Sequence, residues 1–156
     1  MIIEPQYEHT QKGQLHLILY GAAVGAFVVA WLSHEDQPAM IIACFAACLM
    51  VLAGLCFKTL TVRDEGEHLA VRFGPLAVFH TDVPYAQITA VNPARSSIID
   101  GWGIHWMPGR GWTYNLWGFD CVRITLGSKT VRIGTDDPQG LAEFLKTKIA
   151  ADGPAL

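Results

Sequence analysis

The chain of 156 residues has a formal net charge of -3, and this balance argues against binding to nucleic acid through bulk charge. Hydrophobic residues make up 51% of the chain, and they are concentrated in two blocks within its first third. The remainder has the composition of one small soluble domain. The four cysteines lack the spacing of a disulfide framework or a zinc site, so we expect neither a bound metal nor another cofactor.

Residues 15–32 and 39–57 form two apolar blocks without a charged side chain. A helix rises about 1.5 Å per residue, so each block approaches the roughly 30 Å thickness of the hydrocarbon core. The linker, residues 33–38, is polar and short, and Pro38 suits the first turn of the second helix. This pattern predicts a transmembrane helical hairpin over residues 15–57, preceded by an N-terminal segment, residues 1–14.

Two other interpretations of the apolar blocks remain open. The first block could be a cleaved signal peptide, although acidic residues flank it where such a signal carries a basic cluster. Both blocks could instead be buried core helices, although the rest of the chain is small for covering two helices that are apolar all round. Lys12 precedes the first block, Lys58 and Arg63 follow the second, and the linker has no Lys or Arg. The positive-inside rule therefore predicts a multi-pass protein with both termini in the cytoplasm.

Small residues recur at helical spacing in both blocks, at Gly21 and Gly25 in the first and at Ala43 and Ala47 in the second. Such residues let two helices approach closely within a membrane. We expect these four to pack helices together, either within one hairpin or between protomers.

From Thr59 onward apolar residues alternate with polar ones, which is typical of half-buried strands. About seven short strands joined by tight turns are expected, including one at residues 76–81 and one at residues 88–91 that ends at Asn92-Pro93. They predict an antiparallel sandwich or barrel over residues 58–156. After Asp136 or Asp137 as a cap, apolar residues at helical spacing predict a C-terminal capping helix: Leu141, Phe144, Leu145 and Ile149.

This order of elements resembles the pleckstrin-homology-like (PH-like) domains of small bacterial membrane proteins. The segments that carry the resemblance span roughly residues 58 to 150: Arg72-Phe73-Gly74-Pro75, Val83-Pro84, Ile88-Thr89-Ala90-Val91, Gly101-Trp102-Gly103-Ile104, Gly109-Arg110-Gly111-Trp112 and Arg132-Ile133-Gly134-Thr135-Asp136-Asp137-Pro138. The resemblance implies an α+β membrane protein of the bacterial plasma (inner) membrane. In it, the hairpin is followed by a seven-stranded PH-like β-sandwich or barrel with a C-terminal helix. It also implies a module for recognition or assembly rather than catalysis.

One turn departs from the phosphoinositide-binding members of that family. The turn between the first two expected strands of the domain is Asp64-Glu65-Gly66-Glu67, whereas inositol-lipid binders carry basic residues there. We therefore expect no phosphoinositide binding by that route.

Aromatic residues crowd into residues 102–117 around the turn Pro108-Gly109-Arg110-Gly111. Tryptophan, tyrosine and arginine favour both protein interfaces and membrane surfaces, but a core role or a ligand pocket would also place aromatic residues here. The candidate partner- or membrane-contact residues are Trp102, Trp106, Arg110, Trp112, Tyr114 and Trp117.

Together these features predict a membrane-tethered, non-enzymatic module that binds a protein partner or a second copy of itself at the cytoplasmic membrane surface. The alternative is a protein that binds a lipid or small amphiphile, with a role in envelope homeostasis or export. The expected partners are membrane lipids around the hairpin and a protein or homo-oligomer, and not nucleic acid.

Overall fold

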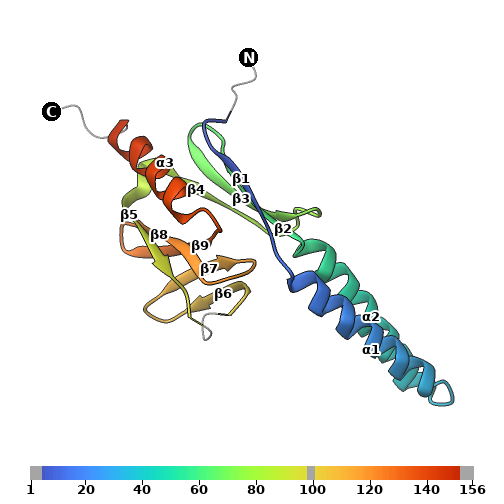
Figure 1. Cartoon of the computed structure of the whole chain (residues 1–156). Helices are drawn as coiled ribbons and strands as arrows, with labels where there is room; N and C mark the ends of the chain where they lie inside the picture. Colours follow the sequence, from blue (N-terminus) through green and yellow to red (C-terminus); the bar gives the residue numbers. More distant parts are fainter. Residues whose placement is uncertain (1–4, 98–100, 152–156) are drawn as a thin grey trace.

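The computed structural model describes residues 5–97 and 101–151, in which a helical hairpin extends from one end of a β-rich domain (Figure 1). The hairpin consists of α1 (Leu15–Leu32) and α2 (Gln37–Cys56), which confirms both predicted helices. Asp36 caps α2 by accepting a hydrogen bond from the Ala39 N–H at 3.3 Å, and Pro38 lies in the first turn.

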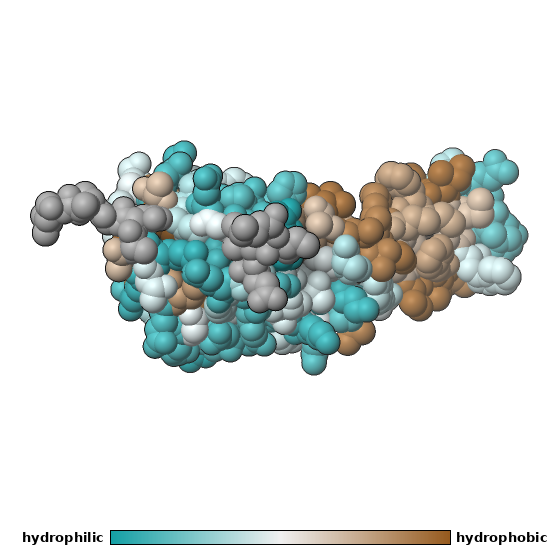
Figure 2. Space-filling model, turned by 90° about the horizontal axis from the view of Figure 1, so that it is seen from above, coloured by the Kyte–Doolittle hydropathy of each residue, from teal (hydrophilic) through white to brown (hydrophobic). Residues whose placement is uncertain are grey.

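Both helices are long and apolar enough to cross a membrane, and most of their side chains are exposed. The buried residues of the hairpin are mainly small ones at which the two helices touch: Ala23, Ala30, Ala47, Gly54 and Cys56. The space-filling view shows the hairpin as a continuous hydrophobic surface beside a largely hydrophilic domain (Figure 2). This exposure disagrees with the interpretation of the two blocks as buried core helices.

The first sheet is a four-stranded antiparallel meander in the order β1-β2-β3-β4. Its strands are β1 (Glu8–Lys12), β2 (Thr59–Asp64), β3 (His68–Gly74) and β4 (His80–Pro84). Strand β1 comes before the hairpin and pairs with β2, which comes after it, with Lys12 opposite Thr59. The two helices therefore continue directly from two hydrogen-bonded strands.

The second sheet has five strands in the order β5-β8-β9-β7-β6, in which β7 and β9 run parallel and the other pairs antiparallel. After the 3-10 turn η1 (Tyr85–Gln87), its strands are β5 (Ile88–Arg95), β6 (Gly103–Met107), β7 (Gly111–Asn115), β8 (Asp120–Leu126) and β9 (Lys129–Gly134). Strand β5 lies at an edge, which allows it to continue through Pro93, where the sequence predicted its end.

The prediction of a seven-stranded sandwich or barrel is wrong in its strand number, and the sheets do not close into a barrel. The described residues form nine strands in two open sheets. The unpredicted strand β1 has little apolar alternation, and it is a strand because β2 supplies its hydrogen bonds. The strand expected at residues 76–81 instead begins at His80, because residues 75–79 form a loop with exposed apolar side chains.

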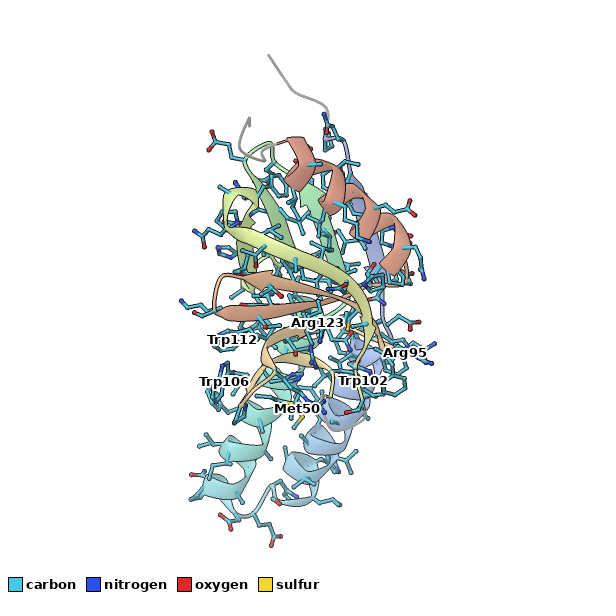
Figure 3. All side chains as sticks on the ribbon, turned by 90° about the vertical axis from the view of Figure 1, so that its left-hand side faces the viewer. Met50, Arg95, Trp102, Trp106, Trp112 and Arg123 are labelled. Atoms are coloured by element: carbon cyan, nitrogen blue, oxygen red, sulfur yellow. The ribbon has the colours of Figure 1, made fainter. Side chains whose placement is uncertain are left out.

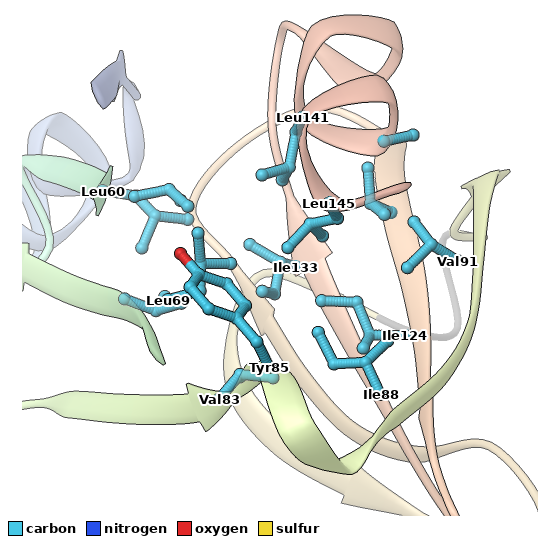
Figure 4. Close-up of a cluster of buried hydrophobic side chains, with 14 of the residues drawn as sticks. Leu60, Leu69, Val83, Tyr85, Ile88, Val91, Ile124, Ile133, Leu141 and Leu145 are labelled. Carbon is cyan, nitrogen blue, oxygen red and sulfur yellow. The ribbon is translucent and has the colours of Figure 1, made fainter. Parts of the chain in front are cut away.

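Helix α3 (Pro138–Ala151) packs against β5, β8 and η1, as the C-terminal periodicity predicted for a capping helix. Asp137 accepts a hydrogen bond from the Gly140 N–H at 3.1 Å, which confirms one of the two expected caps. Leu141 and Leu145 are fully buried between the sheets and face Leu69, Ile124 and Ile133 among others (Figure 4). One hydrophobic core thus joins both sheets and the helix, and it fixes the position of β6 and β7 at its edge.

Candidate interaction surface

The hairpin of β6 and β7 is held against the rest of the second sheet by a turn that requires glycine. The Arg110 N–H donates to the Met107 carbonyl at 3.1 Å and closes the turn. Gly109 and Gly111 have φ angles of +73° and +79°, which disfavour any side chain. A Cβ at Gly111 would also collide with the Thr130 carbonyl oxygen in strand β9. The backbone of the hairpin therefore lies directly against the start of β9.

Trp106 and Trp112 form an exposed aromatic pair on this hairpin. They lie opposite each other in the antiparallel register, and their residues are 57% and 47% exposed. Figure 3 shows both indoles on one side of the hairpin, at the end of the domain from which the helices extend. Indoles this exposed leave a large apolar area in contact with water, which is typical of interaction surfaces.

A pocket of about 430 Å³ lies beside this pair, between the hairpin and the turn from β8 to β9. Leu126 and Val131 give it apolar walls, and Lys129 adds one positive charge. Its volume is within the range of sites for small ligands. The pocket and the two indoles together form what we call the Trp106–Trp112 surface.

Trp102 and Trp117 form a second aromatic pair in a different place. Their rings stack with centroids 4.2 Å apart, and the Trp102 indole N–H donates to the Gly118 carbonyl at 3.3 Å. Gln11 donates from its side-chain amide to the Trp117 carbonyl at 3.0 Å, and Gly13 packs directly against Trp117. Because Gly13 lies just before α1, this pair lies at the domain-side end of that helix.

The six residues singled out from the sequence thus do not form one patch. Trp106 and Trp112 share the surface beside the pocket, and the exposed residue Arg110 occupies the turn between their strands. Tyr114 is half-buried, stacks near Trp112 at 6.3 Å and packs against the core, as Trp117 does. Tyr114 and Trp117 therefore pack against the core, whereas Trp106 and Trp112 are exposed.

The small residues of the helices also separate into two groups. Ala47 is fully buried and Ala43 half-buried in the contact between α1 and α2. Gly21 and Gly25 are exposed, and a Cβ at either position would meet only open space within this chain. The close approach instead occurs at Gly54, where a Cβ would collide with the ring of Tyr20.

Sequence reasoning missed a buried polar cluster that joins the first sheet to α3. Asp64, at the end of β2, accepts hydrogen bonds from the Tyr85 hydroxyl at 2.8 Å and from the N–H groups of Gly66 and Gln6 at 3.0 and 3.2 Å. Lys148 of α3 lies 3.2 Å from the same carboxylate. Because these partners are far apart in the sequence, no local pattern indicates the cluster.

The ionisation of this cluster is set by its surroundings. Burial raises the pKa of Asp64, but hydrogen bonds from Tyr85, from two backbone N–H groups and from Lys148 outweigh burial and hold the pKa below its ordinary value of 3.8. Burial and the neighbouring Asp64 carboxylate raise the pKa of Tyr85 far above its ordinary value. With the carboxylate filled by donors and the phenol kept neutral, this cluster stabilises the fold and is poorly suited to proton transfer.

Within residues 5–97 and 101–151, no three His, Cys, Asp or Glu side chains gather as a metal site would require. His68, His80 and His105 belong to three different strands, and Cys121 is buried in a fourth. No protein-family model matches the chain, and no curated protein matches its sequence.

Proposed function

We propose that this chain is a membrane-tethered, non-enzymatic module that binds a protein partner or a second copy of itself at the cytoplasmic membrane surface. The observation that carries the proposal is the Trp106–Trp112 surface, in which two exposed indoles border a pocket on a hairpin fixed by Gly111. Tryptophan and arginine are enriched where binding energy concentrates in protein interfaces. A rigid strand pair loses little conformational entropy when it binds.

The anchor in this proposal is the hairpin of α1 and α2, crossing the membrane twice. Exposed side chains such as Phe27, Ile42 and Phe45 are stable in lipid and costly in water. The positions of Lys12 and Lys58, next to the domain-side ends of the helices, support a cytoplasmic location for the domain and for both termini. The resemblance to bacterial proteins supports a plasma membrane as the site.

We further propose that the domain is PH-like, with two insertions. Without the β6–β7 hairpin, the second sheet reduces to the antiparallel set β5-β8-β9. Without the helical hairpin between β1 and β2, the first sheet is a four-stranded meander. Four strands, three strands and a C-terminal helix are the PH-like plan. The acidic turn from β2 to β3, where Glu65 pairs with Arg72 at 2.8 Å, supports a ligand other than a phosphoinositide.

A second candidate function is the binding of a lipid or small amphiphile, which the pocket beside Trp106 and Trp112 favours. Its apolar walls suit an acyl or aromatic group, and Lys129 suits an anionic head group. In this function, the pocket would hold one molecule and the indoles would cover it.

Native mass spectrometry of the full chain released from nanodiscs tests both functions in one measurement. We expect a homo-oligomer or a complex with a second protein, and we expect the double variant Trp106→Ala, Trp112→Ala to reduce it to a monomer. Trp31→Ala is the matched control, because it removes an exposed indole from the far end of α1 and should leave the subunit count unchanged. A monomer that retains one lipid-sized mass, lost in the double variant, would replace the assembly function with the lipid-binding one.

A further inference from the structure

The connection between β3 and β4, residues 75–79, is an apolar loop that neither proposed function uses. Its sequence is Pro-Leu-Ala-Val-Phe, and Leu76, Val78 and Phe79 are 41%, 64% and 41% exposed. Turns on a protein surface usually carry Gly, which adopts positive φ without strain, or Asn, Asp and Ser, whose side chains bond to their own backbone. Three exposed apolar side chains in one short loop therefore indicate a surface that water does not cover in the assembled protein.

The loop is fixed at the domain-side end of α2. Phe57, which directly follows α2, stacks on Phe79 with ring centroids 5.3 Å apart and meets Phe73 edge-on at 5.1 Å. The Lys58 N–H donates to the Gly74 carbonyl at 3.1 Å, immediately before the loop. Figure 1 shows the connection from β3 to β4 beside this end of α2. The apolar surface of α2 thus continues through Phe57 onto the loop.

Positive charge accompanies the loop at this level of the molecule. Lys58 is exposed beside Phe57, and the exposed Lys12 lies on the neighbouring strand, opposite Thr59. Exposed apolar side chains with lysines nearby match the boundary of a bilayer, where acyl chains meet anionic head groups. A bilayer that surrounds α2 would also come close to residues 75–79, because the stack of Phe57 on Phe79 holds the loop beside that end of the helix.

We propose that residues 75–79 insert into the head-group region of the bilayer that the hairpin spans, with Val78 and Leu76 as the inserted side chains. This inference rests on the proposed membrane anchor. It adds a third membrane contact beyond the two helices, and the stack of Phe57 on Phe79 holds this contact at a fixed depth. Three contacts that do not lie on one line would fix the tilt of the domain, and so the direction in which the Trp106–Trp112 surface points.

Single-cysteine labelling of the full chain tests the insertion. Three variants carry an environment-sensitive fluorophore at Val78→Cys, at Glu67→Cys or at the native Cys48, with the other native cysteines replaced by alanine. They are reconstituted at high dilution into vesicles of phosphatidylcholine and phosphatidylglycerol that contain a lipid with a head-group-proximal quencher. Glu67 is the matched control, because it is exposed at the opposite end of β3. Cys48 is exposed on α2 and reports on the anchor itself.

We expect the Val78 label to emit at shorter wavelength and to lose intensity with the quencher, while the Glu67 label does neither. If Cys48 shows a lipid environment and Val78 matches Glu67, the insertion is wrong and the anchor stands. If the Val78 label is shifted but unaffected by the quencher, protein covers the loop, which also overturns the insertion. If the Cys48 label itself shows no lipid environment, the proposed anchor fails, and the insertion fails with it.

Discussion

At the scale of single residues, Asp64 connects the first sheet to the C-terminal helix through charge. Its pKa is below 3.8 in the folded protein, because four donors surround the carboxylate, and close to that value in the unfolded chain. Between the folded and the unfolded pKa, the unfolded chain binds a proton that the folded protein does not bind. The stabilisation is therefore complete above the unfolded value and is lost as the pH falls through the folded one.

We expect the free energy of unfolding of the natural chain to fall as the pH drops below about 4, and this fall to be shallower in Asp64→Asn. At neutral pH the variant should be less stable by about 2 kcal/mol, because Lys148 and Tyr85 lose a charged acceptor. Chemical unfolding followed by circular dichroism at several pH values measures both effects. Equal pH dependence in the two proteins would assign the acid sensitivity to other groups.

Gly111 is the second single residue with a large structural effect, because its contact with Thr130 places the β6–β7 hairpin against β9. Gly111→Ala should destabilise the fold by about 3 kcal/mol, because a methyl group there meets the Thr130 carbonyl in a backbone conformation that is already unfavourable for alanine. Gly109→Ala is the control, since its φ angle is similar but the space around it is open, and it should cost only about 1 kcal/mol. Thermal unfolding of the two variants measures the difference, and equal losses would show that the contact with Thr130 is unimportant.

At the scale of elements, α1 and α2 approach each other closely at Gly54 and Tyr20, and not at Gly21 or Gly25. Gly54→Leu should separate α1 from α2, because the new side chain would occupy the position of the Tyr20 ring, and we expect a loss of about 2 kcal/mol. Gly25→Leu places the same side chain in open space and should leave the hairpin as stable as before.

Unfolding of both variants in mixed micelles, followed by helical circular dichroism, compares them directly. A large loss in Gly25→Leu would show that Gly25 packs against something outside this chain, such as a second copy. The subunit count of the same samples would then show whether that contact is with a second copy of the chain.

The elements also differ in how far the sequence predicts them. The positions of α1 and α2 follow from composition, because an apolar run without charges has few alternatives, although α2 spans Gln37–Cys56 where the sequence predicts residues 39–57. Helix α3 follows from its periodicity and from the cap at Asp137. Strand β1 could not be found in this way, since its hydrogen bonds come from a partner beyond both helices. The parallel pairing of β7 with β9 is equally non-local.

The candidate surface was predicted in composition but not in arrangement. An aromatic-rich hairpin is visible in the sequence, whereas the split into Trp106 with Trp112 and Trp102 with Trp117 depends on the turn at Gly111 and on the contact with Gly13. The loop at residues 75–79 was predicted as part of a strand because an apolar run looks the same in sequence whether its side chains are buried or exposed.

At the scale of the whole molecule, the proposed assembly depends on the exposed turn between β6 and β7, which carries Arg110. Arg110→Glu should weaken association with the partner or second copy, because it reverses a charge next to the Trp106–Trp112 surface. The melting temperature should change little, since the residue is exposed. Subunit counts in nanodiscs and a melting curve on the same sample check both expectations. Unfolding of this variant would instead support a structural role for the turn between β6 and β7.

The pairing of β1 with β2 also has a consequence for the order in which the protein is made. Strand β1 precedes both helices and its partner β2 follows them, so this edge of the first sheet can close only after the helical hairpin has been synthesised. Until the two helices have folded against each other, Lys12 and Thr59 lie far apart along the chain, and β2 has an open edge that can pair with another chain. Formation of the helical hairpin is thereby a condition for a finished first sheet.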